Sequence, residues 1–160
     1  MEREHIAQHI KTIAQCEDDD STQLAQLFEP HPLKKGEVFQ LDQVHSRSIF
    51  FLSSGVVQLR SEDSSNGQAE SKYPAPKTLA IYQPTELFFF PFGHPTDHLP
   101  YHFQAITTSL LFLANYGSIE KVIEKRPNFI RHYVSIGENY LKHTFHHIRI
   151  LQQPTGMEKY

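Results

Sequence analysis

The chain of 160 residues has no tryptophan, one cysteine and no apolar run long enough to cross a membrane as a helix. The single cysteine, Cys16, excludes an internal disulfide and a cysteine-rich zinc or iron–sulfur site within one chain. A formal net charge of −3 gives no reason to expect long-range attraction to nucleic acid or to an anionic membrane. The first residues are charged and amphipathic, without the apolar core of a secretory signal. These absences predict a soluble, cytoplasmic protein of one domain.

Lysine and arginine are also absent from a long central stretch, between Lys77 and Lys121. The full charges within this stretch are all negative and belong to Glu86, Asp97 and Glu120. Phosphate recognition usually needs a fixed cation or converging backbone N–H groups. A pocket formed by this stretch would therefore suit a neutral or weakly cationic ligand better than a phosphate.

Hydrophobic periodicity divides the chain into a helical, a strand-like and a second helical part. Residues 3–15 and 21–27 have helical spacing, and the helical period returns at residues 118–125 and, as one long helix, at 128–152. Between them lie short β-type runs separated by turn residues, namely VFQL, RSIFFL, VVQLR, KTLAIYQ, ELFFF, HFQAITTS and LLFLA. This order predicts an α+β fold, in which an antiparallel, jelly-roll-like β-roll (a double-stranded β-helix) is flanked by N-terminal helices and a long C-terminal helix.

The long helix carries apolar side chains at three- and four-residue spacing along one side. Such a stripe is typical of a helix that pairs with a second copy of itself. We therefore expect a homodimer formed through residues 128–152. The residues expected at its seam are Ile130, Val134, Leu141, Phe145 and Ile148.

Several of these pieces, in this order, resemble the sensor domain of the cyclic-AMP receptor protein/Fnr family of transcription regulators. LFEPHPLKKGEVF resembles the start of that family's β-roll, and SIFFLSSGVVQLR resembles two of its strands joined by a turn glycine, Gly55. QAITTSLLFLANYGSIEKVIEKRPNFIRHYV resembles the final strands, the short helix and the start of the dimerisation helix. The resemblance implies one cyclic-nucleotide-binding-like domain over residues 1–160, with a helical lead (1–28), a β-roll (33–115), a short helix plus dimer helix (118–152) and a hinge remnant (153–160).

Residues 84–90 (PTELFFF) stand where the family carries its phosphate-binding cassette. In the family, the cassette glutamate binds the ribose and a following arginine binds the cyclic phosphate. Here Glu86 matches the glutamate, but Thr85 replaces the preceding glycine, and Leu99-Pro100 stands where the arginine would lie. Losing a bidentate charged contact should cost roughly two decades of affinity or more. We expect a degenerate cassette without a cofactor or bound cyclic nucleotide, and a ligand pocket that includes Thr85, Glu86, Phe88, Leu99 and His102.

The C-terminal residues, LQQPTGMEKY, resemble the family's hinge, and the sequence stops before a helix-turn-helix. We therefore expect no direct DNA binding by this chain alone. The aromatic run from Phe88 to Phe92 suits a packed core better than a ligand cavity, with alternate rings pointing inward and the others shielded by a helix.

Eleven histidines stand out in the composition, and His94, His98 and His102 follow one another at four-residue intervals beside the expected pocket. Exposed loop histidines are the simpler interpretation, so no metal site is predicted. Nothing resembles a catalytic set, and no enzyme activity is expected. The predicted function is a regulatory ligand-sensing and dimerisation domain that responds to a small-molecule effector. The alternatives are a purely structural dimerisation partner, a true cyclic-nucleotide sensor with non-standard phosphate contacts, and a cupin-like metal protein in which these histidines meet Glu86.

Overall fold

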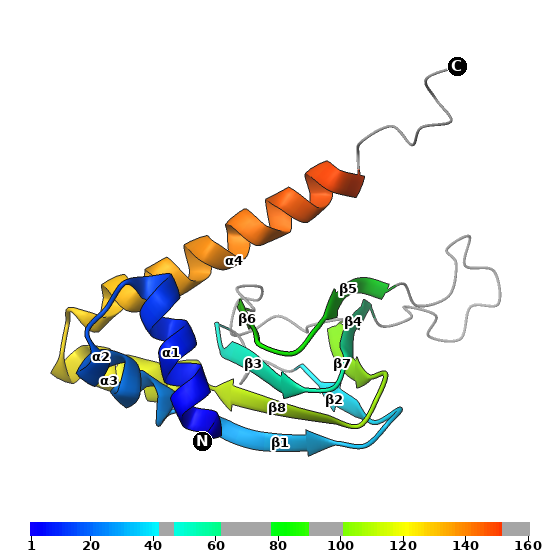
Figure 1. Cartoon of the computed structure of the whole chain (residues 1–160), viewed down its shortest axis with the longest axis horizontal. Coiled ribbons are helices and arrows are strands. Elements are labelled where there is room, and N and C mark those ends of the chain that lie inside the picture. Colours follow the sequence, from blue (N-terminus) through cyan, green and yellow to red (C-terminus); the bar gives the residue numbers. More distant parts are fainter. Residues whose placement is uncertain (42–46, 62–77, 90–100, 152–160) are drawn as a thin grey trace.

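The structure is a computed structural model, and it describes residues 1–41, 47–61, 78–89 and 101–151. Helices lie at both ends of the chain and strands lie between them (Figure 1). In chain order the elements are α1 (Glu2–Ala14), α2 (Asp18–Ala25), β1 (Glu29–Leu33), β2 (Val38–Gln40), β3 (Ile49–Ser54), β4 (Val57–Ser61), β5 (Thr78–Tyr82), β6 (Glu86–Phe89), β7 (Tyr101–Ala105), β8 (Ser109–Ala114), α3 (Tyr116–Lys125) and α4 (Phe129–Leu151).

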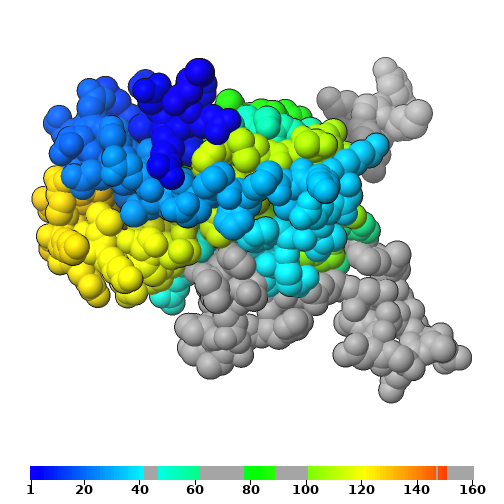
Figure 2. Space-filling view, turned by 90° about the horizontal axis from the view of Figure 1, so that it is seen from below, coloured from blue at the N-terminus to red at the C-terminus, as the bar shows by residue number. Residues whose placement is uncertain are grey.

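The strands form two four-stranded antiparallel sheets, with the orders β1-β8-β3-β6 and β2-β7-β4-β5. Helices α1, α2 and α3 gather at one end of the molecule, and α4 leaves that end and runs past β6 (Figure 1). Figure 2 shows the same division from a second side, with the helices in blue and yellow at one end and the strands at the other. This is the predicted α+β fold with an antiparallel β-roll. Within the described residues, no helix is long and apolar enough to cross a membrane.

Two local features differ from the sequence prediction. The EPHPL segment forms β1, although it was not among the strands predicted from the sequence; its two prolines are tolerated because β1 is an edge strand. The run HFQAITTS is not one strand, because β7 ends at Ala105 and β8 begins at Ser109. The intervening turn bonds to a neighbouring turn: the Ile106 N–H donates to the Val56 carbonyl (2.8 Å), and the Thr107 hydroxyl accepts from the Val56 N–H (2.9 Å).

The apolar run of β3 is explained by burial on both of its faces. Phe50 and Leu52 point between the two sheets, whereas Ile49 and Phe51 point toward the helices, because successive side chains of a strand alternate. Two buried clusters result. The cluster between the sheets, called the roll interior below, consists of Leu33, Leu41, Phe50, Leu52, Val57, Leu59, Tyr82, Phe88, Phe103, Ala105, Leu111 and Leu113.

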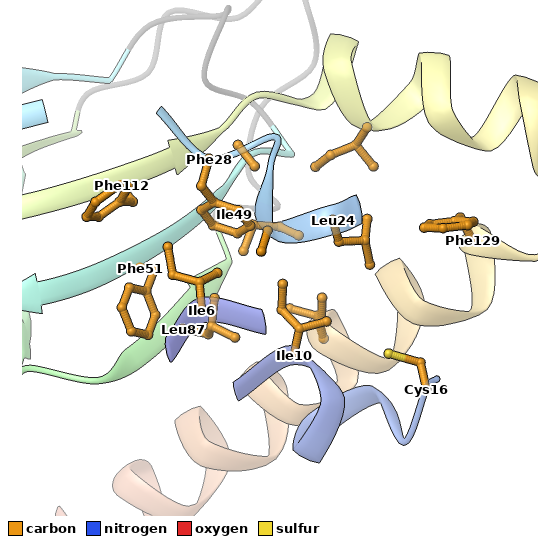
Figure 3. Close-up of a cluster of buried hydrophobic side chains, with 14 residues drawn as sticks. Ile6, Ile10, Cys16, Leu24, Phe28, Ile49, Phe51, Leu87, Phe112 and Phe129 are labelled. Carbon is orange, nitrogen blue, oxygen red and sulfur yellow. The ribbon is translucent and has the colours of Figure 1, made fainter. Parts of the chain in front are cut away.

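The second cluster joins the helices to the outer face of the first sheet (Figure 3). Ile6 and Ile10 of α1 are fully buried there, together with Phe51 of β3 and Phe129 of α4. An ion-pair group adds to this packing, because the Asp20 carboxylate of α2 lies 2.9 Å from His132 Nε2 and 3.0 Å from Arg126 Nη2. The base of α4 is therefore fixed to the body of the protein.

Gly55 forms the turn between β3 and β4 with a backbone φ of +85°. A Cβ at this position would lie 2.5 Å from the Thr108 carbonyl oxygen and closer still to the Ser109 hydroxyl. Both the positive φ and this close approach require glycine. The turn glycine that the sequence resemblance identified is therefore a steric requirement of the roll.

Candidate ligand cavity and the long helix

Aromatic rings of the protein pack directly against one another at the centre of the roll interior. The Phe88 ring stacks between two others: its centroid lies 3.9 Å from that of Tyr82 and 5.5 Å from that of Phe50, with interplanar angles of 9° and 7°. Phe103 meets Phe50 edge-on at 5.0 Å. Each of these side chains is buried. A ligand at this central position would have to displace rings that already stabilise the fold.

A cavity of about 860 Å³ lies between the roll and the C-terminal half of α4, with α1 contributing to its wall. Strands β4, β5, β6 and β7 all line it, and the roll-interior residues Leu59, Tyr82 and Phe88 form part of its surface. This volume falls in the range of small-molecule sites. Among the described residues that line it there is no lysine or arginine, and Glu86 is the single carboxylate. The wall formed by α4 consists of Asn139, Tyr140, His143, Thr144 and Ile148.

The predicted pocket residues are only partly brought together. Thr85, Glu86 and Phe88 line the cavity, and Leu99 lies outside the described residues. His102 is on β7 but does not line the cavity; its neighbour Tyr101 does. Alternation along β7 explains this difference, because adjacent side chains point to opposite faces of the sheet.

Sequence reasoning did not identify the contribution of α4 to the cavity wall. The signal was present in the helical period: residues 139, 140, 143 and 144 share one side of the helix, and the predicted seam occupies another. The α1 residues His9 and Ile13 left no such signal, because their position at the cavity depends on how α1 packs.

Thr85 has a left-handed backbone conformation, with φ of 69°, although it is a β-branched residue. Its N–H donates to the Leu52 carbonyl oxygen at 2.8 Å, which holds the turn before β6 against β3. Glu86 closes the same turn by accepting a hydrogen bond from the Gln83 N–H at 3.2 Å. The turn thus has the backbone shape that glycine adopts most readily, formed here by threonine at a cost in strain.

A pair of tyrosines connects the roll interior to α4 at the edge of the cavity. The Tyr82 and Tyr140 hydroxyl oxygens are 3.2 Å apart, within hydrogen-bond distance. Burial raises the pKa of the Tyr82 phenol well above its ordinary value, so the hydroxyl keeps its proton at neutral pH. Because Tyr82 also stacks on Phe88, this contact joins the packed centre of the roll to the long helix.

Cationic charge and metal ligands are scarce around the cavity. Burial lowers the pKa of His9, which keeps this lining side chain neutral near pH 7. No group of three or more histidine, cysteine, aspartate or glutamate side chains able to hold a metal occurs in the part of the chain that the structure describes. His94 and His98, which the sequence placed beside the pocket, lie outside that part.

One side of α4 bears large apolar side chains that are exposed. The five predicted seam residues, Ile130, Val134, Leu141, Phe145 and Ile148, each have between 42% and 66% of their surface exposed. Phe129 and Ile136 of the same helix are instead buried, in the cluster between the helices and the first sheet. Ile148 is one of the predicted seam residues and also lines the cavity.

No family model and no curated protein sequence matches the chain. Solved structures do match. A cyclic nucleotide-binding domain from Methylobacillus flagellatus KT is 12% identical, with a TM-score of 0.69 over 96% of this chain and 85% of that one. The N-terminal domain of a transcriptional regulator from Streptomyces coelicolor A3(2) is 16% identical, with a TM-score of 0.58 over 82% and 89%. The Thermus thermophilus catabolite activator protein is 14% identical, with a TM-score of 0.55 over 83% and 59%.

These likenesses establish the fold. The chain has the fold of a cyclic nucleotide-binding domain, which is also the fold of the N-terminal domain of a transcriptional regulator, and the resemblance seen in the sequence is confirmed at this level. It spans 59% of the length of the catabolite activator protein.

Proposed function

We propose that this chain is a non-enzymatic regulatory module of the cyclic-AMP receptor protein/Fnr type, which dimerises through α4 and couples a ligand in the cavity to the position of that helix. The observation that carries this proposal is the double use of α4. One of its sides forms the cavity wall and another bears the exposed apolar stripe, and Ile148 contributes to both. A ligand at the wall would therefore contact the same helix that a second copy contacts.

The stripe supports dimerisation because leaving it in water is unfavourable. Fully burying a large aliphatic or aromatic side chain contributes about 1.5–3 kcal/mol. Two copies of α4 side by side would cover ten such side chains, five from each copy. The spacing between Val134, Leu141 and Ile148 is seven residues, the repeat of a two-stranded coiled coil.

Coupling to the roll would pass through the tyrosine pair. Tyr140 faces Tyr82 at the cavity edge, so a molecule that inserts there alters the contact that fixes α4 relative to the roll. A ligand shifts such an equilibrium only by its difference in affinity for the two helix positions. A change in helix angle or register is the kind of movement that an attached or associated reader domain would sense.

A cyclic nucleotide is not the proposed effector. The centre of the roll is packed with the protein's own rings, and the described cavity lining offers no lysine or arginine to a phosphate. Isothermal titration with cyclic AMP and cyclic GMP should give no heat up to millimolar concentration. Micromolar binding would instead establish the alternative, a nucleotide sensor with unusual phosphate contacts.

The dimer is tested by substitution on the stripe. Leu141→Lys places a charge in the middle of the proposed seam and should convert a dimer into a monomer of 18.6 kDa, measured by sedimentation. His146→Lys is the matched control, because this exposed residue is on the opposite side of α4, and it should leave the dimer intact. A wild-type monomer, or a Leu141→Lys protein that stays dimeric, would contradict the proposal.

A further inference from the structure

The cavity has an apolar wall that nothing in the described chain covers. Leu79 and Ile81 of β5 are 52% and 57% exposed, and they point to the same side of the strand because they are two residues apart. Both line the cavity, together with Ile13 of α1 and Ile148 of α4. Large aliphatic side chains from three separate elements therefore line one cavity, which is typical of a site for a ligand with an apolar body.

The charged groups that line the cavity favour a ligand whose polar end carries a positive charge. Glu86 is the single carboxylate among the described lining residues, and no lysine or arginine of the described chain joins it. The Gln83 N–H donates to Glu86 Oε2, which fixes the carboxylate at the cavity. Burial lowers the pKa of His9, so this lining side chain does not supply a fixed positive charge near pH 7.

Side chains of α4 add uncharged hydrogen-bonding groups to the cavity wall. Asn139 and Tyr140 offer an amide and a phenol, while the Thr144 hydroxyl donates to the backbone carbonyl of Tyr140 within the helix. An ammonium group has three N–H donors and no acceptor, so carboxylate, amide and phenol oxygens are suitable partners.

We propose that the cavity binds a small organic amine, with its ammonium group at Glu86 and its apolar body between β5 and α4. The identification of this amine as a regulatory effector rests on the proposed function, whereas its binding does not. Anionic molecules of the same shape are disfavoured, because the described lining residues include one carboxylate and no lysine or arginine. Glu86 is exposed, so its contribution to affinity is moderate.

Two naphthalene probes of opposite charge test the proposal, namely naphthylmethylamine and naphthylacetate. The chain has no tryptophan, so naphthalene fluorescence anisotropy reports binding without an interfering indole signal. The amine should bind at least about threefold more tightly than the carboxylate at pH 7.5. Glu86→Gln should remove this preference, and Glu124→Gln, an exposed carboxylate on α3 that does not line the cavity, should retain it.

The apolar wall is tested separately. Ile81→Thr should weaken both probes by a similar factor, about threefold to fivefold, and leave the preference for the amine unchanged. Val38→Thr is the matched control, because Val38 is an exposed β-branched residue on β2 that does not line the cavity. It should change neither affinity.

Equal or tighter binding of the carboxylate, an unchanged preference in Glu86→Gln, or no binding of either probe at millimolar concentration would overturn the proposal. Sedimentation of the same samples separates this failure from that of the proposed function. An intact dimer that binds neither probe removes the amine site alone. A monomer that binds the amine removes the dimer and leaves the site. Loss of the dimer in Ile81→Thr would assign the β5 wall to the subunit contact and overturn the ligand site.

Discussion

The roll interior and the C-terminal half of α4 are both rich in large apolar side chains, but the two regions differ in what covers them. Phe50 in the roll interior is 0% exposed and contacts three other rings, whereas Phe145 on α4 is 66% exposed. The apolar surface of the interior is buried within a single chain. The apolar surface of α4 is exposed in a single chain. This difference indicates that the binding surfaces of the protein lie on α4 and in the cavity that α4 lines, and not at the packed centre of the roll.

The largest expected effect comes from the same substitution made once in each region. Phe50→Ala should lower the free energy of unfolding by about 3–5 kcal/mol, because it leaves a hole among packed rings. Phe145→Ala should instead abolish any dependence of stability on protein concentration, because it removes a dimer contact and no core contact. Urea unfolding at two protein concentrations measures both.

A large loss of stability in Phe145→Ala at every concentration would show that this side chain belongs to the core of one chain. The comparison between the two regions would then fail.

The tyrosine pair joins the two regions, and its removal should have an intermediate effect. Tyr82→Phe and Tyr140→Phe should each lower the free energy of unfolding by about 1 kcal/mol, since each deletes the same hydrogen bond. The double variant should cost little more than either single one. A double-mutant cycle from denaturant unfolding gives the coupling energy. Fully additive costs would mean that the two hydroxyls act independently and that the proposed link between roll and helix is absent.

The turn beside the cavity should yield a smaller change of opposite sign. Thr85→Gly should raise the free energy of unfolding by about 1 kcal/mol, because glycine adopts the positive φ of this turn without strain. Thr78→Gly is the control and should lower stability, since Thr78 is in β5 with an extended backbone. A Thr85→Gly protein that is less stable than the wild type would contradict this expectation. It would show that contacts of the Thr85 side chain stabilise the fold by more than the strained backbone destabilises it.

The architecture was predictable because its signals are local and repeated. The apolar run of β3, the glycine at position 55 and the helical period after residue 118 each specify one element, and their order matches one known fold. The turn at residues 106–108, where the chain passes from one sheet to the other, was missed because the contacts that place it come from Val56, about fifty residues earlier. The strand EPHPL was missed because its prolines are acceptable only at a sheet edge, a position that the local sequence does not reveal.

The site was less predictable than the fold for the same reason. Thr85, Glu86 and Phe88 follow from one short motif, and the structure places them together at the cavity. The walls from α1 and α4 depend on how helices distant in sequence pack against β5 and β6. His102 was expected in the pocket, but its neighbour Tyr101 lines the cavity instead, because adjacent side chains of a strand point to opposite faces.

Hydrogen exchange at several protein concentrations tests the central contrast most directly. The amides of β3 and β8 should exchange slowly at every concentration, because one chain alone buries them. The amides of residues 141–151 in α4 should gain protection as the concentration rises, because a second copy covers the apolar stripe. Protection of α4 that does not change with concentration would contradict the account, and it would show that this helix has no partner of its own kind.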